Sequence, residues 1–224
     1  MKLQRLSLFA AAVAITVPAI AFAQHGTEKE RKPVEKPAEK VGGAEIGKPA
    51  PDFTLTDING KEVKLSDHKG KIVVLEWFNP ECPVIVKAHT EGSLKTLAAD
   101  ITKDGVVFLA INSSAAGMQG NGVDKNKKGA ETWSLKHPIL IDESGRVGQM
   151  YGAKTTPHMF VIDTKGVLAY AGAIDNNRSG DVTPDKLVNY VTAAIADLKS
   201  PEGKVKEPKT QAYGCSVKYA KPSN

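Results

Sequence analysis

This chain of 224 residues has few cysteines, no apolar run of membrane-spanning length and no phosphate-loop motif. Its two cysteines, Cys82 and Cys215, allow at most one internal disulfide. The apolar run at residues 8–17 ends at Pro18, well short of the roughly 20 residues that span a bilayer. None of the glycine clusters is followed by the Gly-Lys-Ser/Thr of a phosphate-binding loop. These absences argue against stable membrane insertion and against P-loop nucleotide binding.

A strong charge surplus is missing from the part of the chain that we expect to fold. The whole chain carries a net charge of +5, but residues 44–199 hold 18 basic and 19 acidic side chains. The positive surplus lies in the segments before and after that region. A nearly neutral folded region has no basic face for phosphate backbones, so we expect no nucleic-acid partner.

The first 23 residues have the three parts of a secretory signal. Lys2 and Arg5 precede the apolar run, and the small-residue sequence Ala-Phe-Ala at 21–23 follows it. This pattern predicts export with cleavage after residue 23, with an uncleaved anchor as the alternative. Residues 24–43 are charged and contain proline, which predicts a disordered linker. We therefore expect the mature protein in an oxidising compartment outside the cytosol, the periplasm.

Residues 44–199 predict one folded α/β domain. Asn59-Gly60 between alternating segments is a strong hairpin signal, and Thr183 before Pro184 marks the start of the last helix. The expected elements are a hairpin at 52–65, a strand at 72–78, a helix at 83–103, a strand at 106–111, a polar Gly-rich stretch at 113–129, a strand at 138–141, a helix at 146–151, strands at 159–163 and 167–173, and a helix at 183–198. This order predicts a thioredoxin-like fold, a central mixed sheet flanked by helices, with an N-terminal β-hairpin extension. Residues 200–224 then form a C-terminal tail that carries Cys215.

Cys82 lies where a buried strand ends and a helix begins. The unpaired N–H groups and the positive end of the helix dipole at such a junction favour a thiolate, the nucleophilic form of cysteine. The neighbouring carboxylate of Glu81 opposes this effect. The alternative is a buried cysteine that acts only as a small apolar residue.

Two segments together resemble a known superfamily. The sequences GKPAPDFTLTDINGKEVKLSDHKGKIVVLEWFNPECP at 47–83 and YGAKTTPHMFVID at 151–163 are similar to the thioredoxin-like redoxins. The opening resembles that of the AhpC/TSA peroxiredoxins, in particular the exported peroxiredoxin-like proteins. The resemblance covers about residues 44–199.

This resemblance implies roles for particular residues. Cys82 matches the attacking cysteine, and Pro157 matches the cis-proline beside it, so that the backbone of Thr156 would pair with a bound peptide. Glu76 matches the buried acid that helps proton transfer. A carboxylate within a buried strand is costly unless it is paired or used, which supports Glu76 independently. Its alternative is an edge position from which the carboxylate reaches solvent.

The chain also departs from the family pattern. Ile85 replaces the resolving thiol of a Cys-x-x-Cys motif, so a disulfide within the motif is impossible. Leu75 and Asn79 occupy the positions where peroxiredoxins carry proline and threonine, although Asn79 retains a hydrogen-bond donor for a peroxide. The activating arginine is also missing, and Arg146 and Arg178 are only remote candidates.

Cys215 offers a substitute for the missing resolving thiol. Residues 200–214 can extend up to roughly 50 Å, so they can reach Cys82. Two lone cysteines in an oxidising compartment usually pair. Three readings remain open: a catalytic pair that cycles, a permanent structural bridge, and a bond from Cys215 to a partner chain.

The sequence thus predicts an exported thiol oxidoreductase that acts on a peroxide or a protein disulfide and is recycled by an external thiol reductant. Cys82, Cys215 and Glu76 would be catalytic, and Asn79, Pro83, Thr156 and Pro157 would contact the substrate. No cofactor or metal is required. The alternatives are a periplasmic copper or thiol-ligand carrier that uses Cys82 and His158, with Cys215 as an optional third ligand, and an inactive binding module with a structural disulfide.

Overall fold

The computed structural model describes residues 43–221. The predicted signal peptide at 1–23 and all but the last residue of the predicted linker at 24–43 lie outside these described residues. Within residues 43–221, no helix combines the length and apolar character needed to cross a membrane.

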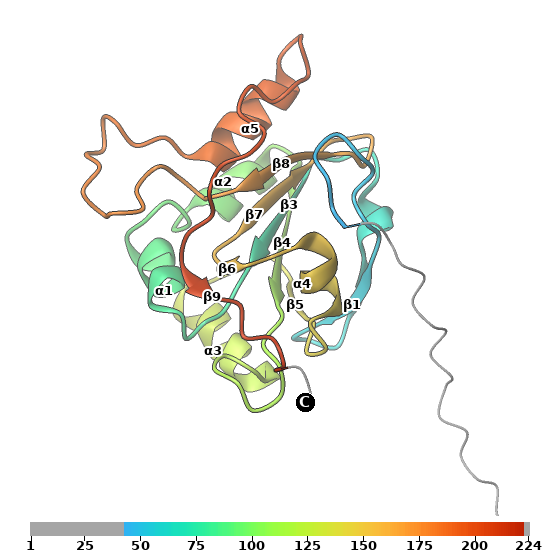
Figure 1. Cartoon of the computed structure of the whole chain (residues 1–224), viewed down its shortest axis with the longest axis vertical. Helices are drawn as coiled ribbons and strands as arrows, with labels where there is room; N and C mark the ends of the chain where they lie inside the picture. Colours follow the sequence, from blue (N-terminus) through green and yellow to red (C-terminus); the bar gives the residue numbers. More distant parts are fainter. Residues whose placement is uncertain (1–42, 222–224) are drawn as a thin grey trace, which may run out of the picture. The chain divides into compact units, whose positions relative to one another are not determined.

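A seven-stranded mixed sheet forms the centre of the described chain (Figure 1). The inner strands β3, β4 and β5 run parallel, whereas β1 and β7 pair antiparallel to their neighbours. Across the sheet the order is β2 (Glu62–Lys64), β1 (Thr54–Asp57), β5 (Ile139–Ile141), β4 (Val107–Asn112), β3 (Val73–Trp77), β7 (Met159–Ile162) and β8 (Leu168–Gly172). The expected mixed sheet with an N-terminal hairpin is confirmed.

The turn of the N-terminal hairpin is stabilised by a side chain and by a glycine. The carboxylate of Asp57 accepts hydrogen bonds from the N–H groups of Asn59 and Lys61, both at 2.8 Å. Gly60 occupies the left-handed region at φ +83°, where a side chain would be strained. The turn therefore follows from the Asn-Gly pair that predicted it.

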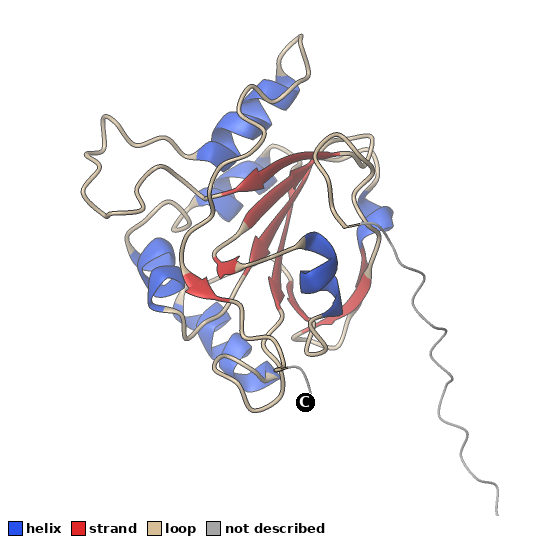
Figure 2. Ribbon diagram, in the orientation of Figure 1, coloured by secondary structure: helices blue, strands red, loops and turns tan. Residues whose placement is uncertain are grey.

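Helices cover both faces of the sheet, as Figure 2 shows. Because side chains alternate along a strand, Val74 and Phe78 face one apolar cluster and Leu75 and Trp77 face another. The first cluster includes residues of α1, α2 and α5, and the second includes residues of α4. The helices are η1 (Leu65–His68), α1 (Pro83–Thr90), α2 (Leu97–Lys103), α3 (Val123–Thr132), α4 (Arg146–Tyr151) and α5 (Tyr190–Lys199).

Three helix predictions need correction. The helix expected at 83–103 is two helices separated by turns at residues 91–96, where Gly92 packs so closely on Ala88 that a Cβ would lie 2.9 Å from its Cα. Part of the stretch expected to be irregular at 113–129 is α3, whose buried residues, Asn126 and Gly129, produce no apolar stripe. The last helix begins at Tyr190 rather than Thr183.

The late start of α5 has a local cause. The side chain of Asn189 accepts a hydrogen bond from the N–H of Thr192 at 3.0 Å and so caps the helix. Thr183 instead closes a turn through its carbonyl, which accepts from the N–H of Lys186 at 2.9 Å. Capping residues occurred at both places in the sequence, and the tertiary packing of α5 selected the second.

After α5, the C-terminal tail runs along the edge strand β8. The N–H of Ala171 in β8 donates to the carbonyl of Pro208 at 3.0 Å, and the N–H of Thr210 donates to the carbonyl of Ala171 at 3.3 Å. The tail then forms β9 (Cys215–Ser216), which pairs antiparallel with β6 (Thr155–Thr156) in a second, two-stranded sheet. In Figure 1 this segment is the red ribbon that runs from α5 to β9.

Candidate active site at Cys82 and Cys215

Cys82 is the N-cap residue of α1 and follows the loop that leaves β3. Its carbonyl accepts the first helical hydrogen bond, from the N–H of Val86 at 2.9 Å, and Pro83 occupies the first turn. Its side chain caps no N–H group and is fully buried. The sulfur is therefore held at the positive end of a helix, which is the environment that stabilises a thiolate after reduction.

Cys82 is joined to Cys215 by a disulfide that spans 133 residues of sequence. The two Cα atoms are 6.1 Å apart, within the ordinary range for such bridges. Neither of the chain's two cysteines is free. The disulfide therefore forms within one chain, as the reach of residues 200–214 allowed.

The disulfide lies inside a pair of short strands. Thr156 is the register partner of Cys215, and the carbonyl oxygen of Thr156 lies 3.2 Å from the sulfur of Cys82. The peptide bond between Thr156 and Pro157 is cis. The backbone that the family resemblance assigned to a bound peptide is thus paired with the chain's own tail.

Glycine is required immediately before Cys215. Gly214 has φ +136°, and a Cβ there would overlap the carbonyl oxygen of Thr156 and lie 3.2 Å from the nitrogen of Pro157. The absence of a side chain lets the tail approach the loop before β7 closely enough for the sulfur atoms to bond.

Two tyrosines anchor the tail on either side of Cys215. The hydroxyl of Tyr213 donates to Asp175, and that of Tyr219 donates to the carbonyl of Ala153 at 2.8 Å. Burial, followed by the interaction with Asp175, raises the pKa of Tyr213 above its usual value. Both hydroxyls are consequently neutral donors at physiological pH.

Glu76 lies on the central strand β3, and its side chain is fully buried. The alternative, an edge position from which it reaches solvent, is wrong, because β4 and β7 flank its strand. Its Oε1 lies 3.0 Å from Nε2 of His89, a residue of α1. Val74 and Phe78, which flank Glu76 on the same face of the strand, belong to the apolar cluster that contains Cys82. The acid and the cysteine therefore share one layer of the fold.

Sequence reasoning assigned no role to His89. Its imidazole stacks on Trp133 with the ring centroids 5.1 Å apart and the planes at 8°. Within the described residues, Nδ1 of His89 and Oε2 of Glu76 have no hydrogen-bond partner. The available signal was its position seven residues after Cys82, two helical turns along roughly the same face of α1.

The loop before Cys82 is held by its own polar groups. Nδ2 of Asn79 donates to the carbonyl of Gln119 at 3.2 Å, and its Oδ1 accepts from the N–H of Glu81 at 2.9 Å. The carboxylate of Glu81 accepts from Lys125 at 3.0 Å and from the N–H of Gly120 at 2.6 Å. These hydrogen bonds, that of Lys125 first, lower the pKa of Glu81. One amide N–H of Asn79 is thus already engaged in the structure of the loop.

His158 follows Pro157 and is a neutral side chain. Its Nδ1 accepts a hydrogen bond from the N–H of Lys154 at 3.3 Å. Burial, assisted by the charge of Lys154, lowers the pKa of His158 to about 4. Residues 43–221 contain no cluster of three or more histidine, cysteine or acidic residues that could hold a metal ion.

The two arginine candidates occupy different places. Arg178 lines a groove of about 1090 Å³ beside the tail, together with Thr155 and His158. Arg146 is the first residue of α4 and is exposed. The groove follows tail residues 209–214 and reaches Thr155 of β6.

Comparison with known proteins identifies the family of this chain. Residues 46–171 match the model of the AhpC/TSA family. The thiol-disulfide oxidoreductase ResA of Bacillus cereus (strain ATCC 10987 / NRS 248) is 29% identical over 147 residues, which are 66% of this chain and 77% of that protein. Peroxiredoxin-2 of Macaca fascicularis is 35% identical over 140 residues, covering 57% of this chain and 68% of that protein.

Two solved structures match the fold closely. An uncharacterized conserved protein from Geobacillus kaustophilus superposes with a TM-score of 0.70 at 33% identity, covering 80% of this chain and 94% of that one. A hypothetical protein from Sinorhizobium meliloti 1021 superposes with a TM-score of 0.69 at 26% identity, covering 80% and 97%. With its thioredoxin-like fold and its paired cysteines, the chain belongs to the AhpC/TSA family and is a thiol oxidoreductase in the general sense of its relatives.

Proposed function

We propose that the protein is an exported thiol oxidoreductase that exchanges disulfides with polypeptide partners, with Cys82 as the attacking thiol and Cys215 as the resolving thiol. The observation that carries this proposal is the Cys82–Cys215 disulfide, which lies within a strand pair formed by the tail and Thr156. An extended polypeptide segment with a cysteine is already bound at this edge, and it is the chain's own.

The exchange cycle starts from the reduced protein. The thiolate of Cys82 attacks one sulfur of a partner disulfide, which forms a mixed disulfide and releases the partner's other sulfur as a thiolate. The thiolate of Cys215 then attacks the sulfur of Cys82 and releases the second partner sulfur. The partner gains two electrons, and the protein retains the Cys82–Cys215 disulfide. An external thiol reductant supplies two electrons to restore the dithiol.

Tail exchange makes this cycle geometrically feasible. While Cys215 is bonded to Cys82, the tail covers the edge of Thr155 and Thr156. After reduction, a partner strand can form the same backbone hydrogen bonds in its place, which is strand addition to an exposed edge. The partner strand then lies next to Pro83, which follows Cys82, and Pro157, which follows Thr156.

Glu76 supplies the proton transfer in this proposal. A buried carboxylate on the same layer as Cys82 can accept the thiol proton as the nucleophile forms and return it as a thiolate leaves. His89 positions this carboxylate through the 3.0 Å contact, and Trp133 orients the imidazole by stacking. His89 is a positioning residue, since its Nε2 contacts Glu76 rather than a sulfur atom.

The proposal includes the cellular location and the division of the chain. In this proposal, residues 1–23 are a signal peptide that directs export, and residues 24–43 are a linker. Residues 44–199 form the redoxin domain, and residues 200–224 form the tail that carries Cys215. An oxidising compartment such as the periplasm suits a lone pair of cysteines that forms a disulfide.

Peroxide reduction is the second candidate, favoured by the similarity to peroxiredoxin-2. In that reaction the thiolate of Cys82 attacks hydrogen peroxide, becomes a sulfenic acid and releases hydroxide, which takes up a proton to form water. The thiol of Cys215 condenses with the sulfenic acid and releases a second water. Asn79 is less available for this role, because one of its N–H groups is bound to Gln119.

Trapping a mixed disulfide tests the main proposal. The reduced Cys215→Ser variant is mixed with a disulfide-bonded polypeptide, and the Cys82→Ser variant serves as the matched control. We expect Cys215→Ser to accumulate a covalent complex that a thiol reductant dissolves, and Cys82→Ser to form none.

Peroxide oxidation is followed in parallel by stopped flow with the same two variants. If Cys215→Ser forms no complex and oxidises rapidly to a sulfenic acid, the peroxide reaction replaces disulfide exchange. If Cys82 reacts with both oxidants no faster than free cysteine, the bridge is structural and the proposal is wrong.

A further inference from the structure

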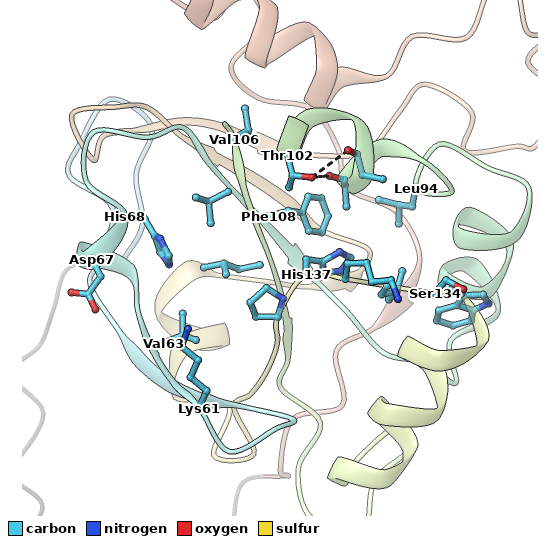
Figure 3. A pocket seen from close by; sticks show the side chains of 18 of the residues that line it. Lys61, Val63, Asp67, His68, Leu94, Thr102, Val106, Phe108, Ser134 and His137 are labelled. Atoms are coloured by element: carbon cyan, nitrogen blue, oxygen red, sulfur yellow. Dashed lines mark hydrogen bonds between the residues drawn. The ribbon is translucent and has the colours of Figure 1, made fainter. Parts of the chain in front are cut away.

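A cavity of about 560 Å³ lies on the sheet away from the disulfide. Its walls come from β2 and η1 on one side, from α2 on another, and from residues 133–138 before β5 (Figure 3). The start of β4 also contributes to its lining. Neither cysteine and no residue of β6 or β9 lines it. The proposed redox chemistry therefore leaves this cavity unexplained.

The cavity is lined largely by apolar side chains, and its volume is typical of sites for small organic molecules. Those that contribute from the surrounding elements are Val63, Leu94, Ala98, Val106, Phe108 and Leu135. A cavity with this lining favours a ligand with an apolar body.

Two imidazoles provide polar atoms without partners. Nε2 of His68 and Nε2 of His137 are buried and form no hydrogen bond within the described residues. Both histidines line the cavity, where Figure 3 labels them, and the ring of His137 packs on Phe108 with the centroids 4.6 Å apart. A buried polar atom left unpaired costs about 1–3 kcal/mol, so a ligand that pairs with it gains affinity.

Both imidazoles are neutral at pH 7. Burial lowers the pKa of His137 to about 3, assisted by the nearby His89. Burial and the charge of Lys71 lower the pKa of His68. A neutral imidazole offers one N–H, which can donate to an oxygen atom of a ligand without bringing a buried charge.

The positive charge around the cavity comes from lysines. Lys61, Lys95 and Lys136 line it, and none of them belongs to an ion pair of the described residues. The lining also includes Lys64, which is paired with Asp52 at 3.9 Å, and the acids Glu62 and Asp67. The balance is positive, which complements an anionic ligand.

We propose that this cavity binds a small carboxylic acid with an apolar chain or ring, its carboxylate accepting from the imidazole of His137 and attracted by the lysines that line the cavity. The apolar body of the ligand packs between α2 and the first residues of β4. This site is separate from the proposed thiol chemistry, and the two proposals are tested independently.

Calorimetric titration of the oxidised full chain with decanoate, below its micellar concentration, tests the proposal. Decylamine is the matched cationic probe, because it has the same apolar chain and the opposite charge. We expect saturable binding of decanoate with one site, and binding of decylamine weaker by about tenfold or more. No binding of decanoate, or equal binding of the two probes, would overturn the proposal.

Substitutions locate the binding. His137→Phe keeps an aromatic ring on Phe108 but removes the N–H, and we expect it to weaken decanoate binding by about tenfold. Ala98→Trp fills the cavity and should abolish binding, whereas Ala193→Trp at an exposed position of α5 should leave it unchanged. Unchanged affinity in a folded His137→Phe variant would overturn the assignment even if Ala98→Trp does not fold.

Discussion

Cys82 and Cys215 meet in one disulfide from two very different surroundings. Cys82 is fully buried between the central strand β3 and helix α1. Cys215 is only partly buried and lies in a two-residue strand of the tail, held by β6 and by the flanking tyrosine hydroxyls. Cys82, the proposed attacking cysteine, is thus positioned by the core of the fold. Cys215, the proposed resolving cysteine, is positioned by a two-residue strand pairing and by two side-chain hydrogen bonds of the tail.

This contrast suggests a division of labour. An attacking thiol must keep its geometry through the cycle, and the core provides that constraint. A resolving thiol must leave the site and return, so weaker and replaceable contacts are suitable for it. The following predictions test this contrast, beginning with the largest expected effect.

Loss of the disulfide should have the largest effect on stability. Opening a bridge between residues separated by 133 positions lowers the free energy of unfolding by up to about 5 kcal/mol in the chain-entropy estimate. Urea unfolding of the oxidised and reduced proteins measures the difference. The double variant Cys82→Ser/Cys215→Ser is the control, because reductant should not change its transition. A difference below about 1 kcal/mol would show that the disulfide contributes little to stability by restricting the unfolded chain.

Glu76→Gln should slow the reaction of Cys82 with a disulfide by about 100-fold near neutral pH, because a carboxamide cannot accept the thiol proton. Glutamine can still hydrogen-bond to His89, so folding is retained. Rates measured as a function of pH separate the two roles of this residue. A loss that disappears at high pH, where the thiol ionises without help, supports proton transfer.

His89→Gln provides a comparison with Glu76→Gln within the same buried pair. It should reduce the rate less, since it leaves the carboxylate in place. An unchanged rate in Glu76→Gln would assign the pair to packing alone.

Gly214→Ala should shift the equilibrium toward the reduced dithiol by about tenfold or more, because the new Cβ overlaps the backbone of Thr156. Gly203→Ala is the matched control. Gly203 also lies in the tail with a positive φ, +59°, but its added Cβ meets no atom within 4 Å. Equilibration in glutathione buffers measures the shift. Equal shifts in the two variants would attribute the effect to backbone conformation rather than to close approach at the disulfide.

Acid should destabilise the folded protein partly through His158. Its folded pKa of about 4 lies below the unfolded value of about 6.5, so its contribution to stability is present above pH 6.5 and is lost as the pH falls toward 4. The slope is at most about 1.4 kcal/mol per pH unit. His158→Asn should reduce this slope in urea unfolding between pH 7 and pH 4. If the slope is unchanged, protonation of other groups accounts for the acid sensitivity.

The central architecture was predictable from the sequence because its signals are local. Buried strands appear as apolar runs, and the first hairpin appears as Asn-Gly between alternating segments. The polar helix α3 was not predictable in this way, because its buried face consists of Asn126 and Gly129. The start of α5 was misplaced because two capping residues compete, and only tertiary packing chooses between them.

The candidate site also has parts that the sequence predicts and parts that it does not. The position of Cys82 at a strand–helix junction follows from the residues around it, and Glu76 is conspicuous as a carboxylate in an apolar run. The partner of Glu76 could not be read from the sequence, since Glu76 and His89 belong to different elements that meet only when α1 packs on the sheet.

The sequence by itself determined the central strands and the first hairpin, the junction that holds Cys82 and the limit of one internal disulfide, because short-range patterns and composition carry this information. Only the tertiary structure decided that the tail returns to pair with Thr156 and that Glu76 is joined to His89. It also decided that an apolar cavity remains beside α2. These features depend on residues that are distant in sequence and become neighbours only when the sheet and its covering helices are assembled.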